Sequence, residues 1–498
     1  MTDITQPTLY SGPPHPSAGE MSGGLAGRNL ELALGIGAAA ATALFVWAHW
    51  SIALVGAVAI LALSAAENEP FLLLVIFLTP VSWVLNGDLP VRNVPVTLHV
   101  LVVIGFFLGR LWRGRLDGKR LLSPALTKAS FLFVGTALAP VVFGGGARTR
   151  GSAGSLYEVV SYLGFFLVVL AWADSQQRIR KILGVLLFST ILTAGLAILQ
   201  EIVGGYTSLW LYLNPPDEGV PQWEWRATSF LSYSNSLAGY LNLVLPFALA
   251  CYVLGKGRWK KLGSWTVGLG FVGLLCTQSL GGLVSFASVV VLAIFCFVTN
   301  WRKRLLLLAF VCVLAIGFYF AKETLNPAHQ GEGFGYDSAV RLLLWSVAWD
   351  LFVHSPIFGV GWGNFVTLYG SYVNFSWVPP GVFDVHNLYL QLLAETGILG
   401  FASFFSLIFL AGREARRLWR AGRDDLGRAL SFGVLGAILT VLVHGSVDFL
   451  FRVSPQFGTL FWMLLALLVA SASPKVLEDR RAPSPQDVRP AGEVAFRA

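Results

Sequence analysis

The sequence predicts an all-α, polytopic helical membrane protein with about 12 to 14 transmembrane helices and a large extracytoplasmic loop that carries amphipathic helices. Three observations lead to this fold class. Hydrophobic residues make up 55% of the 498 residues, charged residues only 12%, and the mean hydropathy is +0.67. The apolar runs are continuous instead of alternating, which favours helices over a β-barrel. The Lys and Arg residues gather in a few short connections between these runs.

Each predicted span is an apolar segment of roughly 17 to 25 residues, the length that a helix needs to cross a bilayer. In chain order these segments are 30–48, 51–66, 70–86, 96–112, 124–143, 156–173, 181–204, 230–254, 262–278, 281–299, 305–321, 386–411, 429–447 and 456–473. The four cysteines lie scattered in these apolar runs without CxxC spacing, so we expect them to pack as free thiols: Cys251, Cys276, Cys296 and Cys312.

The two ends of the chain differ in composition from the rest. Residues 1–27 are rich in Pro, Gly and Ser and lack the basic-then-apolar pattern of a signal peptide, so they are expected to form a disordered tail. Residues 474–498 are likewise expected to form a disordered tail. Between the tails we expect an N-terminal transmembrane bundle at 28–204 and a second membrane domain at 205–473.

The distribution of basic residues predicts the orientation in the membrane. The tails with the adjoining Arg28, together with Lys128 and five connections, hold 28 of the 35 Lys and Arg residues; the connections are 110–120, 178–181, 255–261, 301–304 and 413–428. The positive-inside rule therefore places both termini in the cytoplasm, and the alternating order of the spans agrees at each basic connection. We expect a multi-pass protein of the inner (cytoplasmic) membrane, in contact with lipid and with no nucleic-acid partner. The seven basic residues left outside are Arg92, Arg148, Arg150, Arg226, Lys322, Arg341 and Arg452.

Two extracytoplasmic loops are long enough to suggest a function. The first, 205–229, is rich in Trp, Tyr and Pro. The second, 322–385, contains apolar residues at helical spacing, which predict a helix from Ser338 to about Val353, a Gly-rich turn and a second helical stretch. These helices could lie on the bilayer surface. The turn "GVGWGN" (359–364) could cradle phosphate, but a tight turn is the better interpretation because no strand precedes it.

Polar residues at the outer ends of the spans are the candidate functional residues. Arg226 lies just before a span that also carries Asn235, and Arg341 opens the loop helix. Arginine presents a planar, permanently charged fork that suits phosphate oxygens, so two of them near one cavity predict a diphosphate site. The alternative is that they reach lipid headgroups or pair with acidic residues.

His386 lies at the start of a predicted span, after Asp384 as a plausible N-cap. The positive end of a helix dipole disfavours imidazolium, so a neutral ring is expected there, and a neutral histidine can act as a general base. The alternative is a histidine that only bonds a loop carbonyl. Asn387 is expected to cap or brace the helix.

Three further polar residues lie within the predicted spans or directly after one. Glu395 is expected to make an inter-helix hydrogen bond, or to serve a proton relay. His444 and Asp448 are spaced i, i+4 and are expected to brace each other; they could bind a metal, but no third or fourth ligand of suitable spacing appears. The sequence therefore predicts neither a metal site nor a cofactor site.

Three stretches resemble the O-antigen ligase and polymerase superfamily (Wzy-C-like domain) over roughly residues 190–450. They are "RATSFLSYSNSLAGYL", "RLLLWSVAWDLFVHSPIFGVGWGNF" and "VHNLYLQLLAETGILG". The motif P-x-x-G-x-G-x-x-x-F at 356–365 adds to the likeness. One position departs from it, because Leu280 follows Ser279 where many members have a Ser-Arg pair.

This resemblance implies a membrane glycosyltransferase of the GT-C type that works without a metal. Such an enzyme moves a glycan from undecaprenyl diphosphate to an acceptor hydroxyl, on another glycan, on lipid A-core of lipopolysaccharide, or on a protein. Carried over by position, Arg226 and Arg341 would hold the diphosphate and His386 would activate the acceptor. The sequence leaves ligase, polymerase and protein O-oligosaccharyltransferase open. Two other classes also stay open: a transporter of the bicarbonate-carrier type, and a non-catalytic protein of envelope assembly.

Overall fold

The fold was analysed in a computed structural model that describes residues 55–81, 98–143, 147–203, 226–231, 233–325, 334–372, 384–421, 424–473 and 476. The chain forms two compact units, Met1–Ile60 and Leu61–Ala498. All elements below belong to the second unit, apart from the first residues of a helix at Val55–Ala65. The predicted span at 30–48 and nearly all of both predicted tails lie outside the described residues.

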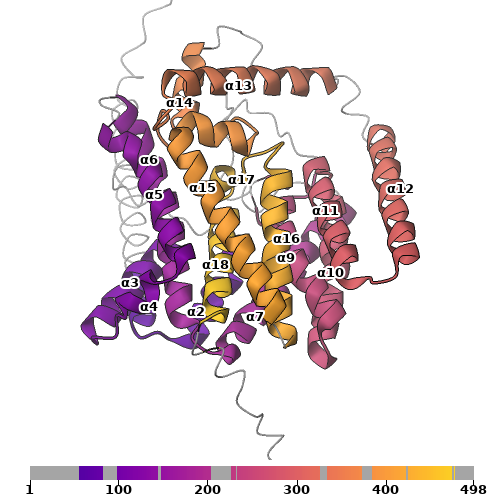
Figure 1. The fold of residues 1–498 in the computed structure, drawn as a ribbon, viewed down its shortest axis with the longest axis horizontal. Coiled ribbons are helices and arrows are strands. Elements are labelled where there is room, and N and C mark those ends of the chain that lie inside the picture. Colours follow the sequence, from indigo (N-terminus) through magenta and orange to yellow (C-terminus); the bar gives the residue numbers. More distant parts are fainter. Residues whose placement is uncertain are drawn as a thin grey trace, which may run out of the picture. The chain divides into compact units, whose positions relative to one another are not determined.

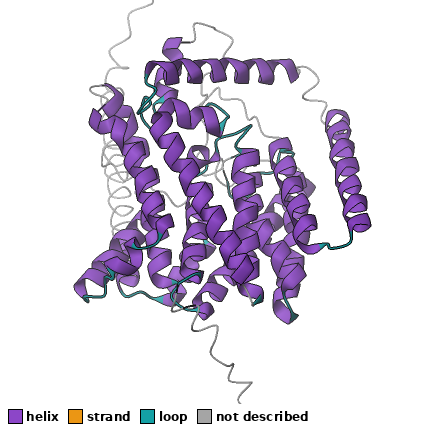
Figure 2. Ribbon diagram, in the orientation of Figure 1, coloured by secondary structure: helices purple, strands orange, loops and turns teal. Residues whose placement is uncertain are grey.

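Every regular element among the described residues is a helix, and none is a strand (Figure 2). The elements of the first half are α2 (Glu69–Phe77), η1 (Thr79–Val81), α3 (Leu98–Trp112), α4 (Gly118–Leu122), α5 (Ala125–Phe143), α6 (Ala147–Trp172), α7 (Gln176–Val203) and α9 (Ser234–Leu254). They are followed by α10 (Gly257–Cys276), α11 (Leu280–Phe297), α12 (Trp301–Leu325), α13 (Phe334–His354), α14 (Phe365–Tyr372), α15 (Leu388–Ala421), α16 (Asp425–His444), α17 (Leu450–Val453) and α18 (Pro455–Ser471).

The all-α polytopic membrane class is confirmed. Within the described residues, six helices are long and apolar enough to cross a bilayer, namely α5, α7, α9, α11, α15 and α16. The helices α3 and α18 and the segment Leu156–Trp172 are shorter but equally apolar. The four cysteines are free, as expected.

The predicted spans 51–66 and 70–86 are not two straight membrane helices. Two short helices, Val55–Ala65 and α2, meet at a bend of 119°, and together they make one broken span or a re-entrant loop. Three residues at the junction explain the break. Glu67 adopts a positive φ of 52°, the Asn68 side chain accepts a hydrogen bond from Phe71 N, and Pro70 starts a new helix.

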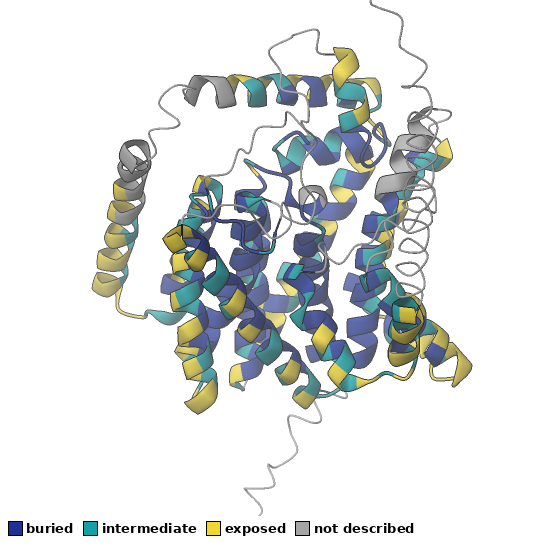
Figure 3. Cartoon of the chain, turned by 180° about the vertical axis from the view of Figure 1, so that it is seen from behind, coloured by how far each residue is buried: buried dark blue, intermediate teal, exposed yellow. Residues whose placement is uncertain are grey.

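The centre of the second unit is formed by helices that are buried on nearly all sides. Every residue of α18 from Gln456 to Ser471 is buried, and α9 is almost as enclosed. Figure 3 shows these central helices mainly in dark blue, as buried, and the exposed residues in yellow, mainly on the outer helices. The exposed side chains include large apolar ones such as Leu306, Phe310 and Phe409, as expected where lipid replaces water as the solvent.

The spans run between two ends that differ in charge (Figure 1). We call one the basic end, because it holds the connections at 255–261, 301–304 and 413–428. There Arg110 and Arg113 pair with Glu67, while Arg178 and Lys181 pair with Glu69. We call the other the polar end; it holds residues 226–235, 277–281, 384–388 and 444–450. The helix α13 crosses this end instead of running along the bundle, as Figure 1 shows.

The helix α15 is broken at Gly397, which has a φ of 63°, and the segment 356–361 fills the break. Val360 N and Gly361 N donate to the carbonyls of Ala394 and Glu395, which close the first half of the helix. Ile398 N and Leu399 N, at the start of the second half, donate to the carbonyls of Pro356 and Ile357. The segment therefore satisfies backbone groups that a break in a helix leaves unpaired. We call this arrangement the α15 joint.

Candidate functional site

The polar end brings His386 and Asp448 together, although they are 62 residues apart in the chain. His386 Nδ1 lies 3.3 Å from Asp448 Oδ1 and 3.3 Å from Asp384 Oδ1. Both carboxylates are almost completely buried, whereas 35% of the His386 side chain is exposed. The histidine thus has one nitrogen held between two carboxylates and part of its ring open to the surroundings.

The electrostatics of His386 differ from the sequence-based expectation. Burial by itself lowers the pKa of His386, but the carboxylates of Asp384 and Asp448 outweigh it and raise the pKa to about 9, against a smaller opposing effect of Arg341. The expectation of a ring kept neutral by a helix N-terminus is therefore wrong. The physical reason is that α15 begins at Leu388, beyond His386, and two buried carboxylates dominate the local field. The same pairing holds the pKa of Asp448 well below its usual range, although burial alone raises it.

The residue that caps α15 also differs from the one predicted. Asn387, not Asp384, caps α15, since its Oδ1 accepts hydrogen bonds from Tyr389 N and Leu390 N, each at 3.0 Å. Its Nδ2 donates to Ser446 O, so the expectation that Asn387 caps or braces is confirmed. Asp384 instead accepts a 2.6 Å hydrogen bond from His386 N and contacts the imidazole.

Arg226 is linked to the same centre through Asn235. Its Nε donates to Thr277 O at 2.8 Å, and its Nη2 donates to Asn235 Oδ1 at 3.0 Å. Asn235 Nδ2 then donates to Asp448 Oδ2 at 2.9 Å. A continuous chain of hydrogen bonds thus joins the guanidinium to the Asp448 carboxylate, which contacts His386.

Arg341 reaches the polar end from α13. Its Nη1 donates to Val447 O at 3.0 Å, beside Asp448, and its charge acts on both His386 and His444. Arg226 also acts on His444. Two half-buried guanidinium groups from different elements therefore border one small region. That arrangement can bind an anion with several oxygens, such as a diphosphate.

Glu395 and the Gly-rich turn belong to the α15 joint. Glu395 Oε1 accepts a hydrogen bond from Phe365 N at 3.0 Å, at the first residue of α14, where the helix dipole favours a carboxylate. Gly359, Gly361 and Gly363 all have positive φ, which confirms a tight turn. The contacts of Glu395 are thus those of an inter-segment hydrogen bond, as expected.

His444 and Asp448 do not brace each other through their side chains. The helix α16 ends at His444, and Asp448 N donates to the His444 carbonyl, while the Asp448 carboxylate binds Asn235, His386 and Phe449 N. His444 is buried, and among the described residues its Nδ1 has no hydrogen-bond partner. The helix α11 packs against the Cδ2–Nε2 edge of the His444 ring, where Gly281 leaves room for it.

Backbone strain gathers at the polar end. Among the described non-glycine residues, four have a positive φ: Glu67, Ser229, Gln278 and His386. The last three lie at the polar end: Ser229 is close to Arg226 in the chain, Gln278 follows Thr277, and His386 is part of the cluster. Such strained conformations cluster at functional sites, because surrounding contacts must hold them in place.

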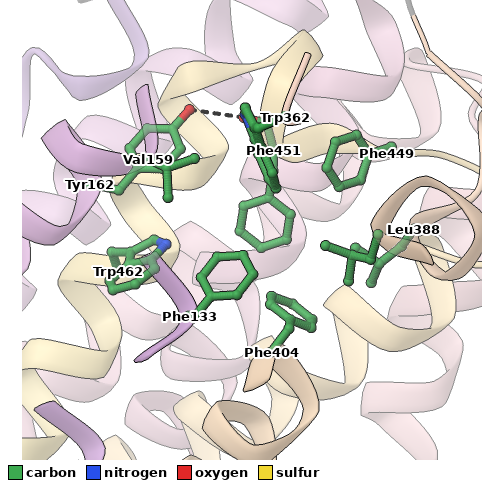
Figure 4. A pocket seen from close by; sticks show the side chains of 10 residues that line it. Phe133, Val159, Tyr162, Trp362, Leu388, Phe404, Phe449, Phe451 and Trp462 are labelled. Atoms are coloured by element: carbon green, nitrogen blue, oxygen red, sulfur yellow. Dashed lines mark hydrogen bonds between the residues drawn. The ribbon is translucent and has the colours of Figure 1, made fainter. Parts of the chain in front are cut away.

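Two cavities lie beside the cluster, and neither suits a large ligand. One, of about 10 Å³, is lined by aromatic and aliphatic side chains, among them Phe133, Trp362 and Trp462 (Figure 4). The other, also of about 10 Å³, is lined by apolar residues together with His444 and Asp448. Both are smaller than usual ligand pockets. A large ligand would therefore approach from the open side of His386.

The cluster brings together possible metal ligands, and it also contains residues that sequence patterns did not reveal. Asp384, His386 and Asp448 present ligand atoms within 4.8 Å of one another, a spacing that could hold a metal ion. The charge of Arg341 and the amide hydrogens of Asn235 oppose a cation there, and the imidazolium of His386 already supplies positive charge. Thr277, Gln391 and Trp345 offered no sequence signal: Thr277 accepts from Arg226 through its backbone carbonyl, and the side chains of the other two bond to the backbone of Val385.

One comparison with known proteins is informative. Residues 265–405 match a family model described as O-antigen ligase. The matched segment contains Arg341, His386, Asn387 and Glu395, while Arg226, Asn235, His444 and Asp448 lie outside it and reach the same end through the fold. No curated protein matches the chain. Residues 265–405 of this multi-pass membrane protein are therefore similar to the O-antigen ligase family.

Proposed function

We propose that the protein transfers a glycan from an undecaprenyl-diphosphate carrier to an acceptor hydroxyl on the outer face of the cytoplasmic membrane. The observation that carries the proposal is the convergence of Arg226, Arg341 and His386 around Asp448 at the polar end. The basic connections lie at the opposite end, which agrees with an extracytoplasmic reaction. The acceptor would be a glycan, lipid A-core or a protein.

Glycan transfer needs cationic groups that stabilise the leaving diphosphate and a base that accepts the proton of the acceptor, and this cluster contains both. In the transfer, the acceptor oxygen bonds to the anomeric carbon of the glycan, the bond from that carbon to the diphosphate oxygen breaks, and the electron pair leaves with the diphosphate. The guanidinium groups of Arg226 and Arg341 would stabilise the charge on the departing diphosphate. The proton of the acceptor hydroxyl would pass to the open nitrogen of His386.

The two carboxylates change how His386 would serve as a base. With a pKa of about 9, only about 1% of the rings are neutral at pH 7. That fraction is a stronger base than an ordinary histidine, because Asp384 and Asp448 stabilise the imidazolium as it forms. We therefore expect transfer to speed up as the pH rises toward 9.

The test is a complementation experiment with a matched histidine control. Cells that lack the gene receive the wild-type protein, His386→Ala, or His354→Ala, and their surface polysaccharide is separated on a gel. His354 lies at the exposed end of α13, and its ring contacts the carbonyl of Asp350 in its own helix. We expect His386→Ala to abolish glycan display while remaining in the membrane, and His354→Ala to behave as wild type.

The gel also distinguishes the reaction types. Loss of attached long chains indicates a ligase, whereas chains of a single unit indicate a polymerase. Normal glycan in the His386→Ala strain would rule out His386 as the base. Normal glycan in the deletion strain, together with impaired solute uptake, would indicate a transporter instead.

A further inference from the structure

The peptide group that joins Val385 to His386 is held by side chains on both sides. Trp345 Nε1 donates to Val385 O at 3.1 Å, and Asp384 Oδ1 accepts from His386 N at 2.6 Å. The preceding amide, Val385 N, donates to Gln391 Oε1 at 2.7 Å. We call Trp345 and Gln391, which lie on two different helices, the Val385 clamp.

The clamp is rigidly supported. Gln391 is fully buried one turn inside α15, and its backbone N donates to Asn387 O. Val385 is also fully buried, in a core cluster shared with Leu344 and Val347 of α13, against which Trp345 packs. The packing of Trp345 and the burial of Gln391 thus support the hydrogen bonds that hold Val385.

The backbone at His386 needs such support. Its φ of 51° lies in the left-handed region, which a residue with a side chain keeps only where neighbouring contacts hold it. This conformation directs the ring toward Asp448. A return to an ordinary φ would swing the imidazole away from Asp448, because the ring follows the backbone to which it is attached.

We propose that Gln391 and Trp345 are positioning residues, which hold the strained Val385–His386 backbone so that the imidazole stays paired with Asp448. The link to catalysis rests on the proposed glycan transfer. The positioning of His386 does not depend on that function. The positioning role and the proposed glycan transfer can therefore be tested separately.

The experiment uses two shape-preserving variants of the full-length protein in lipid nanodiscs. Gln391→Met removes the acceptor for Val385 N, and Trp345→Phe removes the donor to Val385 O while keeping an aromatic ring. Ser346→Ala is the control, since the Ser346 hydroxyl is exposed and bonds only within α13, to Leu343 O. The first measurement is the pH dependence of diethyl pyrocarbonate labelling at His386, read by peptide mass spectrometry. The second is the rate of glycan transfer from a lipid-diphosphate donor.

We expect the labelling midpoint of His386 to lie near pH 9 in the wild type and Ser346→Ala, and to fall in both clamp variants. Because a misplacement of about 1 Å can cost about 100-fold in rate, we expect kcat to fall by about 10- to 100-fold with little change in KM. The double variant should lose less than the product of the two single losses, since both contacts hold the same segment.

Unchanged midpoints in both variants would overturn the inference. So would failure of both variants to accumulate as folded protein, because the contacts would then serve folding alone. Lowered midpoints with unchanged transfer would support the clamp and contradict the role of His386 in the proposed function.

Discussion

Replacing Asp448 with Asn tests the pairing that controls His386. The change keeps the shape of the side chain and removes one of the two carboxylates that raise the histidine pKa. At the observed 3.3 Å, Coulomb's law gives about 1.3 kcal/mol, or about 1 pKa unit, at the permittivity of water, and about four times as much at an effective permittivity of 20.

The smaller figure is the better guide, because solvent reaches the pair. With 35% of the His386 side chain exposed, screening is strong, and we expect the pKa to fall by about 1 to 2 units. More rings are then neutral at pH 7, but each is a weaker base because one of the carboxylates that stabilise the imidazolium is gone. The pH at which transfer reaches half its plateau should therefore fall, and the plateau should fall by about 10-fold.

The assay measures initial rates of glycan transfer in nanodiscs from pH 6 to 10 at saturating donor. The control is Asp350→Asn, which removes an exposed carboxylate from α13. We expect wild type and Asp350→Asn to share a midpoint near 9, and Asp448→Asn to reach its midpoint at a lower pH. Identical midpoints in all three proteins would refute the electrostatic reasoning, and a wild-type rate independent of pH would remove His386 as the base.

Two further predictions concern glycine packing and the donor site. Gly359→Ala should lower the Tm by several degrees and cost about 1–3 kcal/mol, because φ is +72° and a Cβ would lie 2.3 Å from the carbonyl carbon of Glu395. Gly370→Ala, where a Cβ would meet nothing within 4 Å, is its control in a thermal unfolding experiment, and equal Tm values would contradict the packing at the joint. Leu280→Arg adds a guanidinium at the partly exposed first residue of α11, at the polar end. We expect the KM for the lipid-diphosphate donor to fall by about 5- to 10-fold through a charge-assisted hydrogen bond, and an unchanged KM would place Leu280 away from the donor.

Much of the fold could be predicted from the sequence, because long apolar runs have few alternatives to membrane helices. The segments 230–254, 386–411 and 429–447, for instance, correspond closely to α9, α15 and α16. The helix predicted from Ser338 to about Val353 is found as α13, four residues longer at its start. The exception at 51–86 depends on Asn68 and Pro70, which interrupt a helix that hydropathy alone would continue.

The site was harder to predict, because its chemistry depends on long-range contacts. Arg226, His386 and Asp448 were recognisable as polar residues at the outer ends of spans. That Asn235 joins Arg226 to Asp448 could not be read from spacing, and neither could the pairing that makes His386 strongly basic. The error about His386 had a specific cause. The helix starts at Leu388, two residues later than predicted, so the pKa of His386 is governed by the carboxylates of Asp384 and Asp448 and not by the helix dipole.

The α15 joint has a consequence for motion. Because the segment 356–361 bonds to both sides of the break at Gly397 and leads directly from α13 to α14, a tilt of α13 would be transmitted to the half of α15 at the polar end. That half begins directly after His386 and Asn387. A displacement of α13, whether by a bound lipid or by a neighbouring protein, would thus move Arg341 and the turn before α15 together.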